Sequence, residues 1–462
     1  MKKQIDMCEG PLLGNVLRYT IPIVLTGVLQ LLFNSADLIV VGWFCGHESV
    51  AAVGATGALT NLIINLFIGL SVGAGVTVAQ AIGARRDGDI EETVHTAVPV
   101  SVLSGAVLTA IGLLLSRTFL AWMGTPDDVI GLSTVYMQLY FCGMAPCMLY
   151  NFGAAILRAA GDSRSPLIFL SIAGALNVVL NVIFVVFFDM NVAGVALATT
   201  LSQTLSAALV LIALCRRTDA CRFTFRRMRI HKTALWRMVR IGMPAGLQGS
   251  LFSISNVLIQ SSINSFGSVA MSGNAASSSI EGFVYTSMNA VQQTAMNFAG
   301  QNVGALHYDR VRQVLRVCMA CVTGIGLGLG LIAFFLGRPL LGIYITDSPE
   351  AIRLGMERMG YIVLPYFLDG LMEVATGTVR GMGYSMAPTI ATVMGVCVFR
   401  VAWIWWVFPA HRTLETLYVS YPISWILTFV TEYLMFLYYF RKIRLRHADA
   451  AAQIAGRAEA QP

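Results

Sequence analysis

Apolar residues occur in long, nearly uninterrupted runs along the chain, and short polar or basic stretches separate one run from the next. A helix that crosses a membrane needs roughly 20 consecutive, predominantly apolar residues. The runs reach that length repeatedly, so we predict twelve transmembrane helices. Their predicted ranges are 18–43, 51–80, 94–116, 132–157, 166–188, 192–215, 237–265, 274–300, 313–337, 357–380, 386–409 and 417–440.

The composition agrees with this pattern. Of the 462 residues, 56% are hydrophobic and 12% are charged. That charged share is about half the share in an ordinary soluble domain. The composition excludes a soluble protein, and the predicted fold class is all-α integral membrane.

The basic residues indicate how the helices are oriented. By the predicted spans, 25 Lys and Arg residues, Arg380 among them, lie on the side that holds both termini. Five, including Arg358, lie on the opposite side. Because cytoplasmic loops carry the excess of Lys and Arg, we predict both termini in the cytoplasm. The same loops account for the formal net charge of +7, so we expect no nucleic-acid partner.

A sequence motif recurs after 222 residues. Its first copy runs from Leu157 to Pro166 and its second from Val379 to Pro388, with Arg, Gly, Ser and Pro at the same spacing. Each half holds six predicted spans, so both halves enter the membrane from the same side. We therefore predict two six-helix lobes related by a pseudo-two-fold axis along the membrane normal, as in some secondary transporters. The predicted divisions are an N-terminal lobe at 1–215, a cytoplasmic linker at 216–236, a C-terminal lobe at 237–440 and a cytoplasmic tail at 441–462.

Residues that could support enzyme chemistry are scattered. The six histidines fall in or beside predicted loops, and most of the nine cysteines fall inside apolar runs. No His, Cys or Ser constellation forms within one predicted pocket, so we predict no enzyme and no cofactor. A duplicated bundle of this size indicates a transporter.

One carboxylate marks the N-terminal half. Asp37 lies about 9 Å below the predicted outer surface at 1.5 Å per residue, and charged residues at such depth are rare and functional by default. Desolvation disfavours the charged carboxylate, which suits a group that exchanges a proton, as a coupling site requires. The alternative role for the neighbouring amides and hydroxyls is hydrogen bonding between packed helices. The other polar candidates at this level are Asn177, Asn181, Thr199, Tyr136 and Tyr140.

Two carboxylates mark the C-terminal half. Asp369 and Glu373 are one helical turn apart and would repel each other, so we expect a shared proton or a bound cation. Arg400 is predicted at a comparable depth, and its alternative role is an ion pair with one of these acids. Glu281 enters its span only about 9 Å from the outside, so it lies either in the cavity or merely near the interface.

The span that begins near residue 274 carries aromatic, Met and amide side chains. Such surfaces suit large, flat organic cations, because Met repacks easily and aromatic faces attract positive charge. The alternative role of this stripe is ordinary helix packing. We assign to the substrate cavity Glu281, Tyr285, Met288, Asn289, Gln292 and Arg400.

Together these features resemble one family, the multidrug and toxic compound extrusion (MATE) transporters. The resemblance runs from about Pro11 to Lys442, nearly the whole chain. It rests on Asp37 followed by Val41-Gly42, on the repeated Arg-x-x-Gly motif, on Gln80 and Gln301 with their following Gly-Ala pairs, and on the segment from Gly194 to Thr199.

The resemblance implies two lobes around a V-shaped cavity and export of cationic or amphipathic compounds against inward flow of Na+ or H+. It implies a first-lobe cation site at Asp37, Asn177 and Thr199, with Tyr136 as a looser match. Asn181 stands where one branch of the family has a second aspartate.

In the second lobe, Asp369 matches a carboxylate of the NorM-type branch. Phe252 occupies the position of its partner on span seven, and Glu373 could compensate from one turn away. Because the chain fits neither branch fully, Na+ and H+ both remain candidates, bound at Asp37 or at Asp369 and Glu373.

We therefore predict a monomeric multidrug efflux antiporter in the bacterial plasma membrane. The alternative is a lipid-linked oligosaccharide flippase of the same superfamily, whose cavity holds phosphates with basic residues. Arg400 is the one cation that we predict to be buried in a span, against several carboxylates, which favours cationic cargo.

Overall fold

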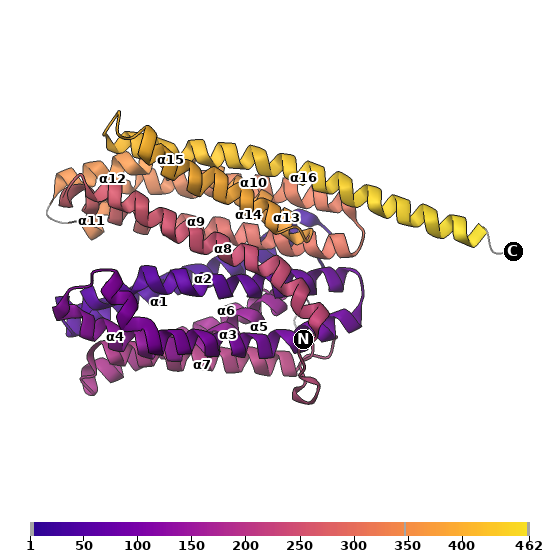
Figure 1. The fold of residues 1–462 in the computed structure, drawn as a ribbon, viewed down its shortest axis with the longest axis horizontal. Helices are drawn as coiled ribbons and strands as arrows, with labels where there is room; N and C mark the ends of the chain where they lie inside the picture. The colour runs from indigo at the N-terminus through magenta and orange to yellow at the C-terminus, as the bar shows by residue number, and fades with distance from the viewer. Residues whose placement is uncertain (1–3, 346–347, 460–462) are drawn as a thin grey trace.

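The computed structural model describes residues 4–345 and 348–459, and every regular element within them is a helix. Figure 1 shows the helices of the first half beside those of the second half, with their long axes nearly parallel. The first half consists of α1 (Leu12–Phe44), α2 (His47–Gly83), α3 (Asp87–Trp122), α4 (Asp127–Cys142), α5 (Met144–Ala159), α6 (Arg164–Val182), the π-helical turn η1 (Ile183–Phe187) and α7 (Asn191–Cys215). The 3-10 turn η2 (Phe225–Arg227) precedes the second half, which consists of α8 (Lys232–Asn264), α9 (Ser268–Gly304), α10 (Tyr308–Phe335), α11 (Gly337–Tyr344), α12 (Pro349–Tyr361), η3 (Leu364–Tyr366), α13 (Phe367–Gly381), α14 (Met386–Thr392), η4 (Val393–Val398), α15 (Phe399–Trp406) and α16 (Leu414–Glu459).

The helices have the length and composition of membrane spans. Within the described residues, nine helical segments are long and apolar enough to cross a membrane, and the bent pair α4–α5 raises the number to as many as ten. The other two predicted spans correspond to α8 and α9, which are 33 and 37 residues long and richer in polar side chains. The prediction of an all-α membrane protein is confirmed for this part of the chain.

Two spans that we predicted as continuous are broken. The span 132–157 bends by 46° at Gly143, between α4 and α5. The span 357–380 is interrupted by the 3-10 turn Leu364–Tyr366, which contains Pro365. Proline removes a backbone donor and clashes with the preceding turn, so a break there is expected on physical grounds.

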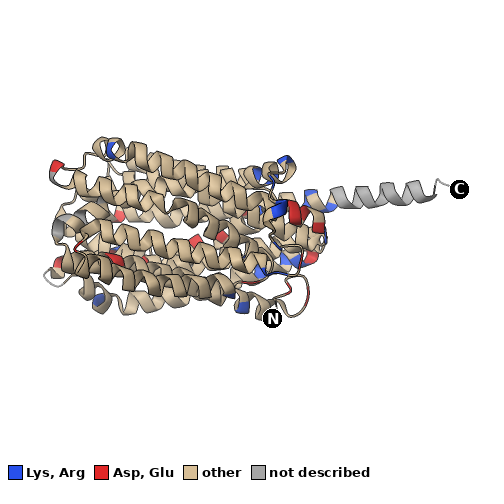
Figure 2. Ribbon diagram, turned by 90° about the horizontal axis from the view of Figure 1, so that it is seen from below, with Lys and Arg blue, Asp and Glu red and all other residues tan. Residues whose placement is uncertain are grey.

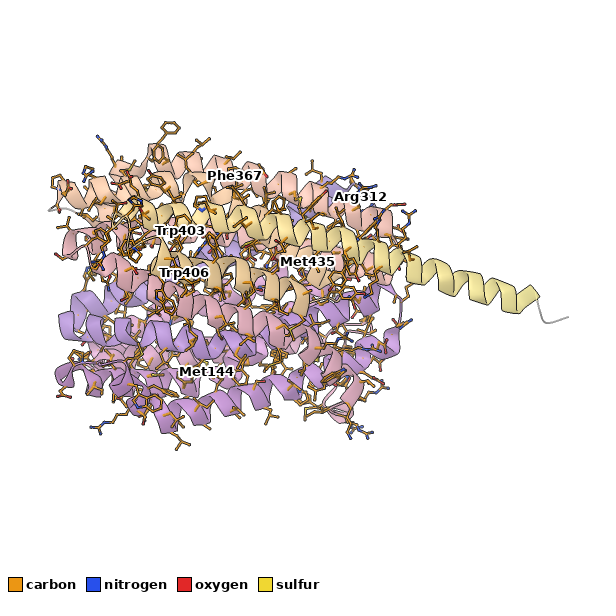
Figure 3. The ribbon with its side chains drawn as sticks, turned by 45° about the horizontal axis from the view of Figure 1, so that its top comes forward. Met144, Arg312, Phe367, Trp403, Trp406 and Met435 are labelled. Atoms are coloured by element: carbon orange, nitrogen blue, oxygen red, sulfur yellow. The ribbon has the colours of Figure 1, made fainter. Side chains whose placement is uncertain are left out.

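Charged residues gather at the two ends of the bundle, and a few acidic ones lie between (Figure 2). The outside of the middle is apolar, as lipid contact requires. Met394, about halfway along the span that α14, η4 and α15 form, is 56% exposed. Trp406, at the end of the same span, is 77% exposed (Figure 3).

Both termini lie toward one end of the bundle, here called the terminal end, and the opposite end is called the far end. Helix α16 runs on through most of the predicted tail, 441–462, and ends at Glu459. Residues 460–462 of that tail lie outside the described residues, as do Lys2 and Lys3.

The lobes join at the terminal end through two matching contacts. Gln80 Nε2 of α2 donates to the carbonyl oxygen of Gly381 at 2.8 Å, and Gln301 Nε2 of α9 donates to that of Ala159 at 2.7 Å. The two donors are repeat equivalents, and so are the two acceptors. Each bond therefore crosses to the opposite lobe at the same place, as a two-fold axis between the lobes requires.

Close backbone approach accompanies these contacts. A Cβ added to Gly83 would lie 1.8 Å from the carbonyl oxygen of Gln301, and one added to Gly304 would lie 2.0 Å from that of Gln80. Only glycine allows backbones this near each other. We call these contacts the interlobe seal; its core is Gln80, Gly83, Gln301 and Gly304.

Candidate cation and substrate sites

The polar candidates of the N-terminal lobe form one cluster around Asp37. Asn181 Nδ2 donates to Asp37 Oδ1 at 2.5 Å, and the hydroxyl of Thr199 lies 3.5 Å from Asp37 Oδ2. Asn177 joins both neighbours, because its oxygen accepts from Asn181 at 3.3 Å and its amide donates to Thr199 at 3.3 Å. Helices α1, α6 and α7 each contribute to the cluster, and the two asparagines lie one turn apart on α6.

This cluster carries one negative charge and an unused oxygen. The structure gives Asp37 no ion pair with any basic side chain of the described residues. Asn181 Oδ1 is buried and accepts no hydrogen bond within the same part of the chain. A buried acceptor without a donor is costly, and a cation would satisfy it together with the carboxylate. Hard cations such as Na+ prefer oxygen ligands of this kind.

Tyr136 stands beside the cluster rather than in it. Its ring packs against the apolar group Val40, Val41, Val185 and Val195 and stacks on Tyr140 with centroids 6.0 Å apart. No hydrogen bond links Tyr136 to Asp37 among the described residues. The tyrosine therefore forms part of the wall around the site.

The C-terminal lobe contains a cavity of about 530 Å³. It lies toward the far end, because its lining comes from the last turns of α8 and the first turns of α9. Asn65 of α2 also contributes, so the cavity reaches the N-terminal lobe. Its other polar and aromatic lining residues include Asn256, Asn274, Glu281, Tyr285, Arg358, Tyr366, Asp369, Glu373, Arg400, Tyr421 and Trp425.

The two acids of α13 have different partners inside this cavity. Glu373 accepts a hydrogen bond from Gln292 Nε2 at 2.5 Å. Asp369 accepts none from the described residues, although it is only 7% exposed. Asp369 is therefore free to interact with a ligand in the cavity, whereas Glu373 is already held by α9.

Arg400 does not form the ion pair that we considered for it. Its guanidinium stacks 3.9 Å from the ring centroid of Tyr421, and its Nε donates to Ser424 at 3.0 Å. No ion pair within 4.0 Å joins it to Asp369 or Glu373 in the described residues. Cation–π stacking and the hydroxyl hold the charge instead, which leaves the two acids without a paired cation.

Glu281 lines the cavity and is neutralised there by Arg358, 2.5 Å away on α12. Arg358 also donates to Ser277 Oγ at 2.9 Å and is 5% exposed. We counted Arg358 with the basic residues that lie at the outer side, whereas the structure buries it inside the lobe. Its burial follows from the partner on α9, which the spacing in the sequence does not reveal.

Three residues assigned to the substrate cavity lie outside its lining. Met288 is 1% exposed and packs against Gly326 and Gly370, so its assignment is corrected. Asn289 and Gln292 bond to each other at 3.3 Å, further along α9 than the cavity lining reaches. Along α9, Tyr285 is the last residue that lines the cavity, and the later residues of the predicted stripe lie beyond it.

Two further charged residues are buried, and we did not predict them as buried from the sequence. Glu432 of α16 is fully buried and accepts from Thr392 Oγ1 at 2.6 Å. Arg380, which we counted with the basic residues on the side of the termini, is 6% exposed at the end of α13 and donates to Gln248. A single acid within an apolar run was a sufficient signal for Glu432, because the same signal identified Asp37.

The chain matches a known family model in both halves. The model named MatE matches residues 22–183 and 244–406. The two matches begin 222 residues apart, which is the spacing of the repeated motif. The internal repeat is thus confirmed by comparison with other proteins.

Curated relatives match over most of their length. The chain is 26% identical over 433 residues to the probable multidrug resistance protein YoeA of Bacillus subtilis, covering 92% of this chain and 93% of that protein. It is 23% identical over 392 residues to the probable multidrug resistance protein NorM of Thermotoga maritima, covering 84% and 83%.

Solved structures share the fold. A structure described as MATE in the bent conformation superimposes with a TM-score of 0.89 at 20% identity, covering 97% of this chain and 100% of that chain. An outward-facing multidrug resistance MATE transporter gives a TM-score of 0.89 at 20% identity, covering 96% and 99%. These neighbours are twelve-helix proteins of two lobes, so the predicted fold class is confirmed.

Proposed function

The chain belongs to the MatE family of multidrug efflux transporters, and we propose that it exports cationic or amphipathic organic compounds in exchange for Na+ or H+. It is a multi-pass membrane transporter and not an enzyme. In the proposed orientation the terminal end faces the cytoplasm of a bacterial cell, and the far end faces outside. We propose a monomer as the working unit.

The observation that carries this proposal is the charge balance of the cavity. Glu281 and Arg358 neutralise each other, and the guanidinium of Arg400 is stacked on Tyr421. Asp369 and Glu373 then outnumber the one remaining cation. Aromatic rings beside carboxylates that have no paired cation attract positively charged, flat compounds, which supports organic cations as cargo and disfavours the phosphates of a lipid-linked oligosaccharide.

The Asp37 cluster supports a second, smaller site. Its carboxylate and the unused oxygen of Asn181 lie close together, in a space bounded by three helices. We propose that the coupling cation, Na+ or H+, binds there and also reaches Glu373. No step requires a bound cofactor.

Exchange follows if the two passengers favour different states of the same protein. A ligand shifts a conformational equilibrium only through its differential affinity for the two states. Suppose that the coupling cation binds best when the far end is open and the drug binds best when the terminal end is open. Inward movement of the cation then drives outward movement of the drug.

The test is flux in proteoliposomes that contain the full chain. A fluorescent organic cation is loaded, and its movement is followed under a Na+ gradient alone and under a pH gradient alone. We expect one of the gradients to drive uphill movement of the dye. Movement that neither gradient accelerates beyond protein-free liposomes would refute the antiport mechanism.

A further inference from the structure

A continuous chain of side-chain hydrogen bonds joins the cavity to the opposite lobe. It begins at Glu373, which accepts from Gln292 at 2.5 Å, and Gln292 accepts from Asn289 at 3.3 Å. Asn289 accepts from Gln293 at 2.8 Å, and Gln293 accepts from Arg158 Nη1 at 2.9 Å. Arg158 belongs to α5 of the N-terminal lobe, whereas the other four residues belong to α9 and α13.

All four bonds of this chain point in the same direction. An arginine side chain can only donate, and an ionised carboxylate can only accept. The two ends therefore fix which way each of the three amides is turned: every oxygen faces Arg158 and every NH2 group faces Glu373. Chains with this polarity strengthen each other cooperatively.

The chain ends beside the interlobe seal. Arg158 directly precedes Ala159, whose carbonyl accepts from Gln301. Asn297, one turn beyond Gln293 on α9, donates to Tyr19 of the N-terminal lobe at 3.1 Å. The bond between Arg158 and Gln293 is thus one of a group that holds the lobes together toward the terminal end.

We propose that this chain transmits the charge state of Glu373 to the interlobe seal, with Asn289, Gln292, Gln293 and Arg158 as positioning residues. Hydrogen bonds to charged groups are roughly twice as strong as neutral ones. A proton or Na+ on Glu373 weakens its bond to Gln292, and the weakening passes along the amides to Arg158. The seal then opens more readily.

This inference rests on the proposed antiport and gives it a direction. A coupling cation that enters from the far end neutralises Glu373 and loosens the terminal end. An organic cation held by Asp369 leaves Glu373 ionised and the chain complete. The two passengers consequently have opposite effects on the seal, as exchange requires.

Other titratable groups surround Glu373 and could respond to the same cation. Asp369 and Arg380 share its helix, Tyr285 faces it from α9 and Glu432 faces it from α16. No hydrogen bond or ion pair joins any of these to Glu373 in the described residues. The route through Gln292 is therefore the direct contact that leads from this carboxylate to the N-terminal lobe.

Hydrogen exchange of the backbone amides at the seal measures the effect in the full-length protein. The segments to follow by mass spectrometry are 154–164 and 296–306, at high pH without Na+, at high pH with Na+, and at lower pH. In the wild type we expect loading by one of these cations to speed exchange about tenfold, equivalent to about 1.4 kcal/mol. A wild type that responds to neither cation would point to failure of the proposed antiport itself.

The variant Gln293→Glu distinguishes transmission of the charge state of Glu373 from a role that only holds the two lobes together. The new carboxylate still accepts from Arg158, so the seal stays closed, but it cannot donate to Asn289. We expect slow exchange that no longer responds to the cation. A purely structural role predicts the wild-type response, and that result would overturn the inference.

Two further variants complete the test. Asn289→Leu breaks the chain in the middle and should give fast exchange that loading does not change. Gln138→Leu removes a comparable amide, which donates to the carbonyl of Leu113 at 3.0 Å within the N-terminal lobe, and should retain the full response. If Asn289→Leu responds as Gln138→Leu does, the chain is not the route.

Discussion

The two lobes hold their acidic side chains in different surroundings, although one duplicated scaffold produced both. Asp37 lies in a small cluster with three neutral partners and no paired cation among the described residues. Asp369 and Glu373 lie in a cavity of about 530 Å³ with aromatic rings and two arginines. A compact set of oxygens suits a small ion, and a wide aromatic cavity suits an organic one.

The repeat shows how the difference arose. At the 222-residue offset, Asp37 corresponds to Ile259 and Thr199 corresponds to Tyr421. Both counterparts line the cavity of the second lobe. The same backbone positions thus carry oxygen ligands in one lobe and an apolar or aromatic surface in the other, while the glutamines of the seal remain alike.

Removing the charge of the first cluster should have the largest effect. In Asp37→Asn the cluster loses its one negative charge, so we expect gradient-driven efflux to fall to the level of protein-free liposomes. Dye flux in proteoliposomes measures this, and the amount of folded protein in the membrane is checked in parallel. Asp309→Asn, at an exposed position in the first turn of α10, is the control. Normal efflux by Asp37→Asn would exclude this residue from the mechanism.

The buried ion pair of the second lobe offers the next largest effect. Arg358→Met leaves Glu281 buried without its cation, and breaking a buried pair this way costs about 3–5 kcal/mol. Thermal unfolding in detergent should show a clear loss of stability. Adding Glu281→Gln to the same chain should recover most of it. Equal stability of the single and double variants would mean that the pair is not coupled.

Asp369 tests the assignment of the larger cavity to the substrate. Asp369→Asn should weaken binding of a fluorescent organic cation about tenfold, or about 1.4 kcal/mol, because the free carboxylate is lost. Fluorescence anisotropy of the purified protein measures the affinity. Binding of Na+ or H+ at Asp37 should change little. A large change in cation binding with unchanged dye binding would reverse the roles of the two lobes.

The hydroxyl of Thr199 should matter least. It lies 3.5 Å from Asp37 Oδ2, and a hydrogen bond typically contributes about 0.5–1.5 kcal/mol. Because the hydroxyl donates to the empty, charged carboxylate and stabilises it, Thr199→Val should raise the affinity for the coupling cation by a factor of about 2 to 12, measured by calorimetry. A loss of affinity for the cation would instead show that the hydroxyl oxygen is a direct ligand.

Three features could be predicted from the sequence: the number of membrane-spanning segments, their grouping into two lobes, and the cluster around Asp37. Hydrophobic runs fix the spans, and the repeated motif fixes the relation between the halves. Asp37 stands out because an acid inside an apolar run is costly to insert into a membrane and is rare unless it functions there. Its partners on α6 and α7 stand out because they are polar at the same depth.

The polar partners inside the second lobe could not be predicted in the same way. Whether Arg358 is a loop residue or the counter-ion of Glu281 depends on how α12 packs against α9, and spacing along the chain does not contain that information. The stacking of Arg400 on Tyr421 likewise depends on the rotation of two helices about their axes. Met288 shows the same limit, since a helical stripe indicates a face but not what that face contacts.

The most direct test of the central claim is displacement of one cation by another on the purified protein. A saturating organic cation such as tetraphenylphosphonium is added to the transporter loaded with radioactive Na+, or to the transporter in weakly buffered solution, and the released Na+ or H+ is counted. The account predicts release of the coupling cation by the wild type and no release by the double variant Asp37→Asn/Glu373→Gln, in which both proposed cation sites have lost their charge. Binding of the organic cation without release of either ion would contradict it.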